Sequence, residues 1–349
     1  MGPPNRAARD EWHCSATSYG LAVPSVGMGR PHSRRWRWTA IAASVLAVLA
    51  VVSIVLITTR TSGKNHADAT PPPPSTSAST PAPSTRPVTR PASPTPKKPS
   101  LASSATVNAA LRKLATQRPA GGVSVAALNT KTGAQYSFGA GSGMRTGSVA
   151  KLFLLETVLL QHQDEGTPLS GGELSLATPM IENSDNKAEY QLFLQAGGRD
   201  ALTDAFPRLG LSHSVPGYSD PALTTTSGSD GVKLVRNLVR NGPLNAYSRS
   251  LALGLMRNVE SDQRWGVSAV ADTGSTVALK NGWLSVDDSN GPGENDNDRW
   301  LVNSVGVVTV RGQQVLLAAF TQHGTDYQSG VRLVEALVKA ITPAVVAQP

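Results

Sequence analysis

Proline density divides this chain into parts that can and cannot fold. Eleven prolines lie between Thr70 and Ser100, interspersed with Ser, Thr, Ala, Arg and Lys. Each proline removes a backbone donor, and the segment has too few large apolar side chains to form a core. We therefore expect residues 60–102 to be an extended, polyproline-like linker whose proline-rich part spans up to about 95 Å. The folded domain is then expected at residues 103–349.

An uncharged apolar run precedes the linker, from Thr39 to Thr59. At about 1.5 Å per residue, a helix of this length spans about 31 Å, close to the thickness of the bilayer's hydrocarbon core. Arginines are concentrated just before the run, which favours a cytoplasmic N-terminal tail at residues 1–38. We expect residues 39–59 to be a single membrane anchor, with the C-terminal domain outside the cytoplasm.

The alternative for this run is a cleaved signal peptide. Ala67-Asp68-Ala69 matches a small-residue cleavage site, but it lies well beyond the run and past two charged residues. The run is also long for the apolar part of a signal peptide, so an uncleaved anchor is the favoured interpretation.

The basic charge of the chain lies outside the predicted domain. Residues 1–100 contain twelve Lys/Arg and three Asp/Glu, whereas residues 101–349 contain twenty and twenty-one. A nucleic-acid-binding domain carries positive charge on the domain itself, so we expect no nucleic-acid partner. Cys14 is the single cysteine and the six histidines are scattered, so we expect neither a metal site nor another cofactor. The acidic segment Asp287–Asp298 lacks the ligand order of a calcium loop and is expected to be a solvated hairpin loop.

Hydrophobic patterns in the C-terminal part predict an α+β domain. A helical block lies between the second and third of five predicted strands, and apolar residues at Val334, Leu337, Val338 and Ile341 have the spacing of a closing helix. This order predicts an antiparallel five-stranded sheet flanked by helices, with the middle helices forming a second, all-helical lobe. The predicted strands are residues 123–128, 135–138, 276–279, 300–310 and 315–321.

Ser148 and Lys151 form the first motif that could carry chemistry. They stand three residues apart at the head of an apolar run, and on a helix this spacing places both side chains on one face. A serine hydroxyl needs a base nearby to act as a nucleophile, and a lysine amine can serve when it is neutral. Ser148 could equally be an ordinary helix cap and Lys151 a solvated lysine.

Ser184-Asp185-Asn186 is the second motif. The hydroxyl of Ser184 could relay a proton to a leaving nitrogen, and Asn186 could bind a substrate amide or hold Lys151. The structural alternative is a turn or a helix cap, because Ser, Asp and Asn all favour such positions.

The third motif is Lys280-Asn281-Gly282, which continues a predicted strand and is followed by Trp283. Lys280 could hold a substrate carboxylate, and Gly282 would let a substrate backbone approach closely. The N–H groups of Trp283 and Ser148 could together stabilise an oxyanion. The alternative is a solvent-facing lysine at the end of a hairpin.

The ordered set S-x-x-K, S-D-N and K-x-G resembles the class A β-lactamases and their low-molecular-weight penicillin-binding relatives. The resemblance covers roughly residue 103 to the C-terminus. It implies an α/β sandwich with a helical lobe and a site between them. It also implies that Ser148 is the acylated nucleophile and Lys151 the base, with Ser184 as proton shuttle and Lys280 as carboxylate-binding residue.

The chain departs from this family pattern in three respects. Asn281 stands where the family has threonine or serine, and the short spacing from Ser148 to Ser184 implies a reduced helical lobe. The family also has a loop glutamate that activates the deacylating water, whereas residues 205–219 contain no carboxylate and Asp220 comes late in the loop. Because loss of a positioned base typically costs roughly 10²–10⁴-fold in rate, we expect slow deacylation.

These observations favour a membrane-anchored, extracytoplasmic serine hydrolase that forms an acyl-enzyme with a β-lactam or a peptidoglycan-type amide. The alternative is a catalytically idle module of the same fold that binds the cell wall or a protein. The expected partners are such a substrate and, through one helix, the membrane. The ectodomain is expected to be monomeric.

Overall fold

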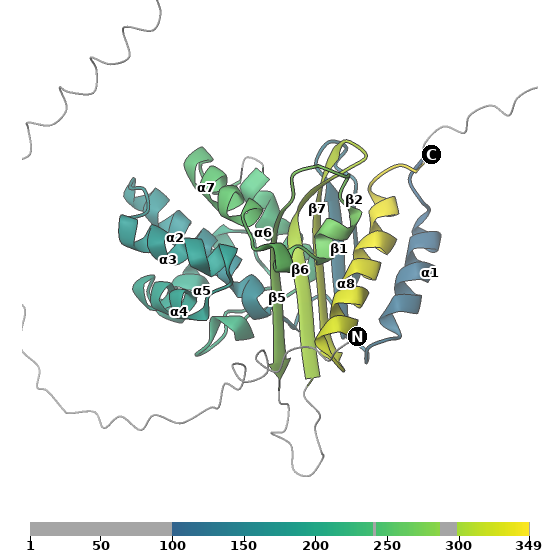
Figure 1. Ribbon diagram of the computed structural model, residues 1–349, viewed down its shortest axis with the longest axis horizontal. Coiled ribbons are helices and arrows are strands. Elements are labelled where there is room, and N and C mark those ends of the chain that lie inside the picture. The colour runs from purple at the N-terminus through teal and green to yellow at the C-terminus, as the bar shows by residue number, and fades with distance from the viewer. Residues whose placement is uncertain (1–99, 240–241, 287–298, 349) are drawn as a thin grey trace, which may run out of the picture. The chain divides into compact units, whose positions relative to one another are not determined.

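The computed structural model describes residues 100–239, 242–286 and 299–348 (Figure 1). The predicted tail, membrane anchor, nearly all of the linker and the acidic segment 287–298 lie outside these residues. Within the described ranges, no helix combines the length and the hydropathy that a bilayer span requires. Ser100 and Gln348 form an isolated antiparallel bridge through two backbone hydrogen bonds, with N···O distances of 3.0 and 2.8 Å.

An antiparallel five-stranded sheet organises the described residues, with the strand order β2-β1-β7-β6-β5. This agrees with the sheet predicted from the sequence, although the third predicted strand, residues 276–279, covers only the start of a longer one. The strands are β1 (Val123–Asn129), β2 (Gln135–Gly139), β5 (Ala278–Val286), β6 (Arg299–Val310) and β7 (Gln313–Gly324), and a separate short pair is formed by β3 (Met144–Arg145) and β4 (Thr225–Thr226).

Helices cover both faces of this sheet, as Figure 1 shows. Two helices from the ends of the described chain, α1 and α8, lie on one face, and α2–α7 lie on the other. The helices are α1 (Ser104–Ala115), α2 (Ala150–Glu165), α3 (Gly171–Glu182), α4 (Asn186–Gln195), α5 (Gly198–Arg208), α6 (Gly228–Val239), α7 (Ala246–Arg257) and α8 (Tyr327–Ile341). Short 3₁₀ turns are η2 (Gly147–Val149), η3 (Pro221–Leu223), η4 (Ser261–Gln263), η5 (Gly266–Val270) and η6 (Thr342–Ala344).

Strand alternation divides the core into two layers. Along β7, Leu317 and Ala319 pack towards α8, whereas Leu316 and Ala318 pack towards the helical lobe. Successive side chains of a strand point to opposite faces, so a sheet covered on both sides needs nearly continuous apolar runs. The apolar stretches of β6 and β7 meet that requirement, and the four predicted apolar positions of α8 are all buried.

Helix α2 is the centre of the helical lobe, because every residue from Ala150 to Leu160 is buried. A helix that is enclosed on all sides buries its polar residues along with its apolar ones. Lys151 and Glu156 are therefore both fully buried. The fold thus creates an enclosed lysine in the first turn of α2, next to the edge strand β5.

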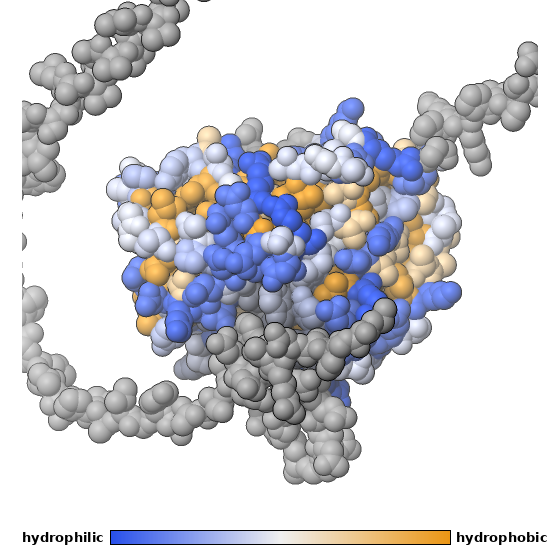
Figure 2. Space-filling view, in the orientation of Figure 1, coloured by the Kyte–Doolittle hydropathy of each residue, from blue (hydrophilic) through white to orange (hydrophobic). Residues whose placement is uncertain are grey.

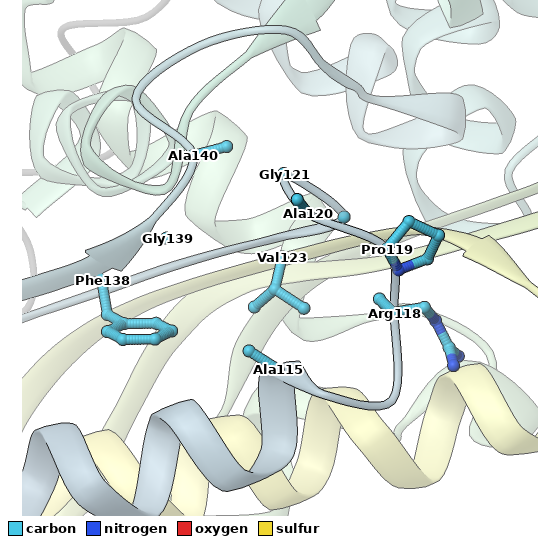
Figure 3. A pocket seen from close by; sticks show the side chains of 10 residues that line it. Ala115, Arg118, Pro119, Ala120, Gly121, Val123, Phe138, Gly139 and Ala140 are labelled. Carbon is cyan, nitrogen blue, oxygen red and sulfur yellow. The ribbon is translucent and has the colours of Figure 1, made fainter.

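A pocket of about 340 Å³ lies apart from this region, at the other edge of the sheet, between the end of α1 and the start of β1 (Figure 3). Arg118, Val123 and Phe138 are among its lining residues, and none of the predicted site residues reaches it. On the face of the molecule seen in Figure 2, hydrophilic and hydrophobic residues are interspersed. The motif residues lie instead at the β5 edge of the sheet, on η2, α2, β5 and the connection into α4.

Candidate active site

Ser148 lies in the 3₁₀ turn η2 that leads into α2, and it is half-buried. The preceding Gly147 has a φ of 53°, and a Cβ there would lie 3.2 Å from the backbone nitrogen of Trp283. Asn303 of β6 holds the segment before the turn, since its side-chain amide donates to the carbonyls of Arg145 and Thr146 at 2.9 Å each. The sheet therefore fixes the serine-bearing turn against strand β5.

Lys151 joins three groups of the site from the first turn of α2. Its Nζ donates to Ser148 Oγ at 2.9 Å and to Asn186 Oδ1 at 2.8 Å. It also forms an ion pair with Glu189 Oε2 at 2.7 Å. An ammonium has three donors, so these three acceptors satisfy the buried group completely. The predicted pairing of Ser148 with Lys151 is thus present in the structure.

Ser184, Asp185 and Asn186 form the connection into α4. The Asp185 side chain caps this helix by accepting from the Ala188 backbone N–H at 2.7 Å. Ser184 has a φ of 61°, in the left-handed region that non-glycine residues seldom occupy. This strained geometry turns the chain so that Ser184 Oγ lies towards β5 and Asn186 towards α2, consistent with a functional constraint.

Lys280 extends from β5 to meet the second motif. Its Nζ donates to Ser184 Oγ at 3.0 Å and to the carbonyl of Asn281 at 3.0 Å, and the side chain is fully buried. Burial lowers the pKa of Lys280 well below its ordinary value, and the nearby charge of Lys151 lowers this pKa further. Glu189 opposes that shift. Two hydroxyls and two lysines from three distant segments therefore meet in one place.

Gly282 allows β5 to run directly against the serine-bearing turn. A Cβ on this residue would lie 2.5 Å from the Thr146 carbonyl oxygen, 2.6 Å from the nitrogen of Val149 and 2.9 Å from that of Ser148. No side chain fits in that space, so glycine is required by the close approach of two backbones. The expected role of Gly282 in admitting substrate becomes here a role in bringing β5 to Ser148.

Asn281, a candidate for binding the substrate carboxylate, makes its side-chain hydrogen bonds within the fold. Asn281 follows Lys280 directly on β5, so their side chains lie on opposite faces of the sheet, and Asn281 is fully buried. Its amide donates to the carbonyls of Gln263 at 2.7 Å and Trp265 at 3.2 Å, which ties the η4–η5 segment to the sheet. Both N–H donors are engaged within the protein, so this amide has none left for a substrate carboxylate.

Three tryptophans gather around Tyr327. The rings of Trp265, Trp283 and Trp300 lie 5.9, 5.8 and 5.9 Å from the Tyr327 ring, between centroids. Trp283 thus directs its indole towards the α8 side of the sheet, while its backbone nitrogen lies near the turn of Ser148. The indole of Trp283 therefore packs on the α8 side of the sheet, and only its backbone nitrogen lies close to the candidate site.

Glu189 is the site residue that the motif search misses. It follows Asn186 by three positions on α4, so the two side chains share a helix face. Glu189 is 5% exposed, and burial raises the pKa of its carboxyl, against the opposing effect of Lys151. The available signal was a carboxylate one helical turn beyond Asn186. No group of three His, Cys, Asp or Glu residues in the described ranges is arranged to hold a metal ion.

A model of the "Beta-lactamase enzyme family" matches residues 173–345, which include Ser184 and Lys280 but not Ser148. Among curated proteins, LppW of Mycobacterium tuberculosis (strain ATCC 25618 / H37Rv), named as a candidate lipoprotein, is 24% identical over 223 residues, covering 62% of this chain and 68% of LppW. LppW of Mycobacterium bovis matches equally well.

Solved structures match over nearly their full length. PBP-A superimposes with a TM-score of 0.56 at 20% identity, covering 67% of this chain and 94% of PBP-A. The TLA-3 extended-spectrum β-lactamase gives 0.58 at 16% identity, with coverages of 68% and 98%. A β-lactamase from Burkholderia vietnamiensis gives 0.55 at 18% identity, with coverages of 67% and 94%. These structures show that the chain has the fold of the class A β-lactamases and PBP-A, and the family match over residues 173–345 is consistent with a β-lactamase-like protein.

Proposed function

We propose that this protein is a serine hydrolase that forms an acyl-enzyme at Ser148, with a β-lactam or a peptidoglycan-type amide as substrate. The observation that supports this most directly is the Lys151 Nζ to Ser148 Oγ hydrogen bond of 2.9 Å. A nucleophile with its base in hydrogen-bond reach, and a third group holding that base, is the arrangement that nucleophilic catalysis needs.

Acylation in this proposal is a transfer of the substrate's acyl group from nitrogen to oxygen. Ser148 Oγ attacks the carbonyl carbon while its proton moves to Lys151, and the carbon–nitrogen bond then breaks. Ser184 Oγ gives a proton to the leaving nitrogen and regains one from Lys280. Once the two lysines have re-equilibrated, the net change is one proton moved from Ser148 to the leaving amine.

Two backbone nitrogens would stabilise the oxyanion that forms in this step. Those of Ser148 and Trp283 both border the contact between η2 and β5, where glycines at 147 and 282 keep the backbones close. Preorganised N–H donors of this kind typically contribute about 10²–10³-fold to the rate. Lys280 has one donor beyond its two hydrogen bonds, and we assign it to the substrate carboxylate.

Deacylation is expected to be slow. Asp220, the acid nearest the end of the 205–226 loop, is exposed, and its Oδ1 accepts from the Ala222 backbone N–H at 2.8 Å to cap η3. It is therefore committed to the turn rather than directed at Ser148. Among similar proteins, a point mutant of PBP-A is described as an acyl-enzyme complex with penicillin G. We propose that this chain also forms an acyl-enzyme with penicillin and that its adduct is long-lived.

We also propose that the domain acts outside the cytoplasm and is tethered to the membrane by residues 39–59. The uncharged run and the arginines that precede it support this topology. A lipoprotein name for the similar protein LppW points to the same compartment. Protease added to intact cells should remove the C-terminal domain, whereas complete protection would contradict the topology.

The central experiment is covalent labelling of the full-length chain with a fluorescent penicillin, followed by intact-mass measurement. We expect one adduct, located on Ser148, and no adduct on the Ser148→Ala variant. Absence of label on the unsubstituted chain with any β-lactam tested would count against the hydrolase and favour the idle binding module.

A further inference from the structure

Glu189 is a buried acid held directly against the base of the site. Its Oε2 lies 2.7 Å from Lys151 Nζ, and the residue is 5% exposed. Its other oxygen, Oε1, is buried and has no hydrogen-bond partner among the described residues. A carboxylate that is left half-satisfied in the interior costs free energy, so its presence calls for an explanation.

The proposed reaction requires a group that can accept a proton from Lys151, and Glu189 is placed to do so. Lys151 can accept the proton of Ser148 only as a neutral amine, and its Nζ is paired with the Glu189 carboxylate at 2.7 Å. In a buried site, the direct route for the proton of this amine is to a group within hydrogen-bond distance, and transfer to solvent is the slower alternative. The acceptors within that distance of Lys151 Nζ are the Ser148 hydroxyl, the Asn186 amide and the Glu189 carboxylate. Of the three, only the carboxylate is basic enough to take a proton.

The surroundings of Glu189 make its carboxyl easier to protonate than a carboxyl in water. Glu189 faces Lys151 of α2, Lys280 of β5 and Asp220 of the loop before η3. Burial and the charge of Asp220 raise the pKa of Glu189, while the two lysines lower it, and the net shift is upward. Lys151 in turn lowers the pKa of Lys280, in addition to the larger effect of burial, because like charges repel at short range in a poorly solvated site.

We propose that Glu189 is a positioning residue that holds Lys151 between Ser148 and Asn186 and takes up its proton, so that Lys151 becomes the base for Ser148. The inference rests on the proposed acyl transfer and names the group that makes it possible. The first step moves one proton from the Lys151 ammonium to Glu189, giving a neutral amine and a neutral acid. The amine then accepts the Ser148 proton as Oγ attacks.

The placement of this acid differs from what the family resemblance implies. The resemblance leads one to seek a carboxylate on the loop, and residues 205–219 contain none. In this chain, α4 supplies the acid, one turn after Asn186 and on the same face, so that both side chains hold Lys151. The acid contacts the lysine rather than the reacting serine, so we assign it to acylation and not to water activation.

The test compares Glu189→Gln with Glu165→Gln in the full-length chain. Glu165 is exposed at the end of α2, so its substitution is a matched control with no expected effect. The measurement is the second-order rate of Ser148 labelling by a fluorescent penicillin from pH 5 to 10. Near neutral pH, Glu189→Gln should lower this rate on the order of 10²–10⁴-fold.

The pH profile separates proton uptake from a merely structural role. In Glu189→Gln, Lys151 has to lose its proton to solvent, so the labelling rate should rise by up to about tenfold per pH unit. The deficit relative to the unsubstituted chain should therefore shrink as the pH rises. A deficit that is constant at every pH, or labelling at the unsubstituted rate, would overturn the proposal.

Folding of the variants is checked by thermal unfolding. If Glu189→Gln does not fold, Glu189→Asp replaces it, because it keeps the charge but draws it back by one methylene. The Glu189→Asp variant should label more slowly than the original chain. Its labelling rate should change with pH on the acid side in the same way as that of the original chain. A Glu189→Asp profile that lacks this acid-side pH dependence would contradict proton uptake by residue 189. Failure of the unsubstituted chain to label at all would instead overturn the proposed hydrolase itself, so the two failures are distinct.

Discussion

Lys280 Nζ and Ser184 Oγ lie 3.0 Å apart although 96 residues separate them in the chain. This hydrogen bond joins the edge strand of the sheet to the helical lobe. It also links the second and third motifs, just as the Lys151 to Asn186 hydrogen bond of 2.8 Å links the first and second. The site is therefore one connected network, and several of its members can be tested separately.

Ser184 combines a hydroxyl with a left-handed backbone, and two substitutions separate these properties. Both Ser184→Ala and Ser184→Gly remove the proton relay, so each should lower the labelling rate by roughly 10²–10⁴-fold. Glycine tolerates the φ of 61° and alanine does not, so the glycine variant should be more stable by about 1 kcal/mol. Labelling kinetics and urea unfolding check the two effects. Unequal labelling losses would show that backbone strain, rather than the hydroxyl, controls the rate.

Gly282 is expected to tolerate no side chain. In Gly282→Ala, the new Cβ would meet the Thr146 carbonyl at 2.5 Å and the Val149 nitrogen at 2.6 Å, so β5 has to move away from Ser148. We expect a loss of stability of about 1–3 kcal/mol and a loss of labelling. Gly254→Ala is the matched control, because nothing lies within 4 Å of its Cβ position on α7. That control should stabilise the protein by roughly 0.5–1 kcal/mol.

Asn281→Thr introduces the residue that the family resemblance leads one to expect. Because the Asn281 amide satisfies the carbonyls of Gln263 and Trp265, threonine should leave at least one of them without a donor. The expected result is a destabilisation of about 1–3 kcal/mol without faster labelling. Thermal unfolding and labelling rates provide the measurement. If the variant labels faster and its stability is unchanged, the result would support a role for residue 281 in substrate binding.

Glu156 should make stability depend on pH. It is fully buried on α2 and accepts one hydrogen bond, from Asn237 at 3.1 Å, and burial raises its pKa well above 4.5. Between the unfolded-state pKa and this higher folded-state pKa, the native protein binds the extra proton. Stability is then lost as the pH rises through that window, by up to about 1.4 kcal/mol per pH unit. Unfolding free energies from pH 4 to 9 should show this slope for the original chain and a flatter curve for Glu156→Gln. Equal slopes in the two proteins would refute the assignment.

The lifetime of the acyl-enzyme is the remaining expectation. Since Asp220 caps η3 and residues 205–219 contain no acid, water at the Ser148 ester lacks a positioned base from this loop. Intact-mass spectra taken after removal of excess penicillin should show the adduct persisting over many minutes. Hydrolysis of many equivalents of penicillin in that time would mean that another group activates the water.

Much of the fold could be predicted because its signals are local. The apolar spacing of Val334, Leu337, Val338 and Ile341 predicts α8, and all four residues are buried there. Alternation and apolar runs likewise indicate the strands and their order around a helical block. The strand that carries Lys280 could be predicted, but the burial of that lysine could not, because a fully buried lysine resembles a solvated one in sequence.

For the candidate site too, some features could be predicted from the sequence and others depend on the tertiary fold. Motif order in the sequence is enough to select four candidates, because each motif contains a residue type suited to its proposed chemical role. These candidates are Ser148, Lys151, Ser184 and Lys280. Alternation along β5 could already have indicated that Lys280 and Asn281 face opposite sides of the sheet. Which of those two faces meets the helical lobe depends on how the sheet is covered, which no short stretch of sequence specifies.

The amino-acid sequence alone determined the three motifs, the order of helices and strands, and the absence of an acid from residues 205–219, because each depends on neighbours along the chain. Tertiary structure alone decided that Glu189 would meet Lys151, that Asn281 would bind the η4–η5 segment, and that Gly282 would contact the turn of Ser148. The physical reason is that burial and charge pairing are set by segments distant in sequence. An acid on a helix becomes part of a site only when packing excludes water and brings a buried lysine against it.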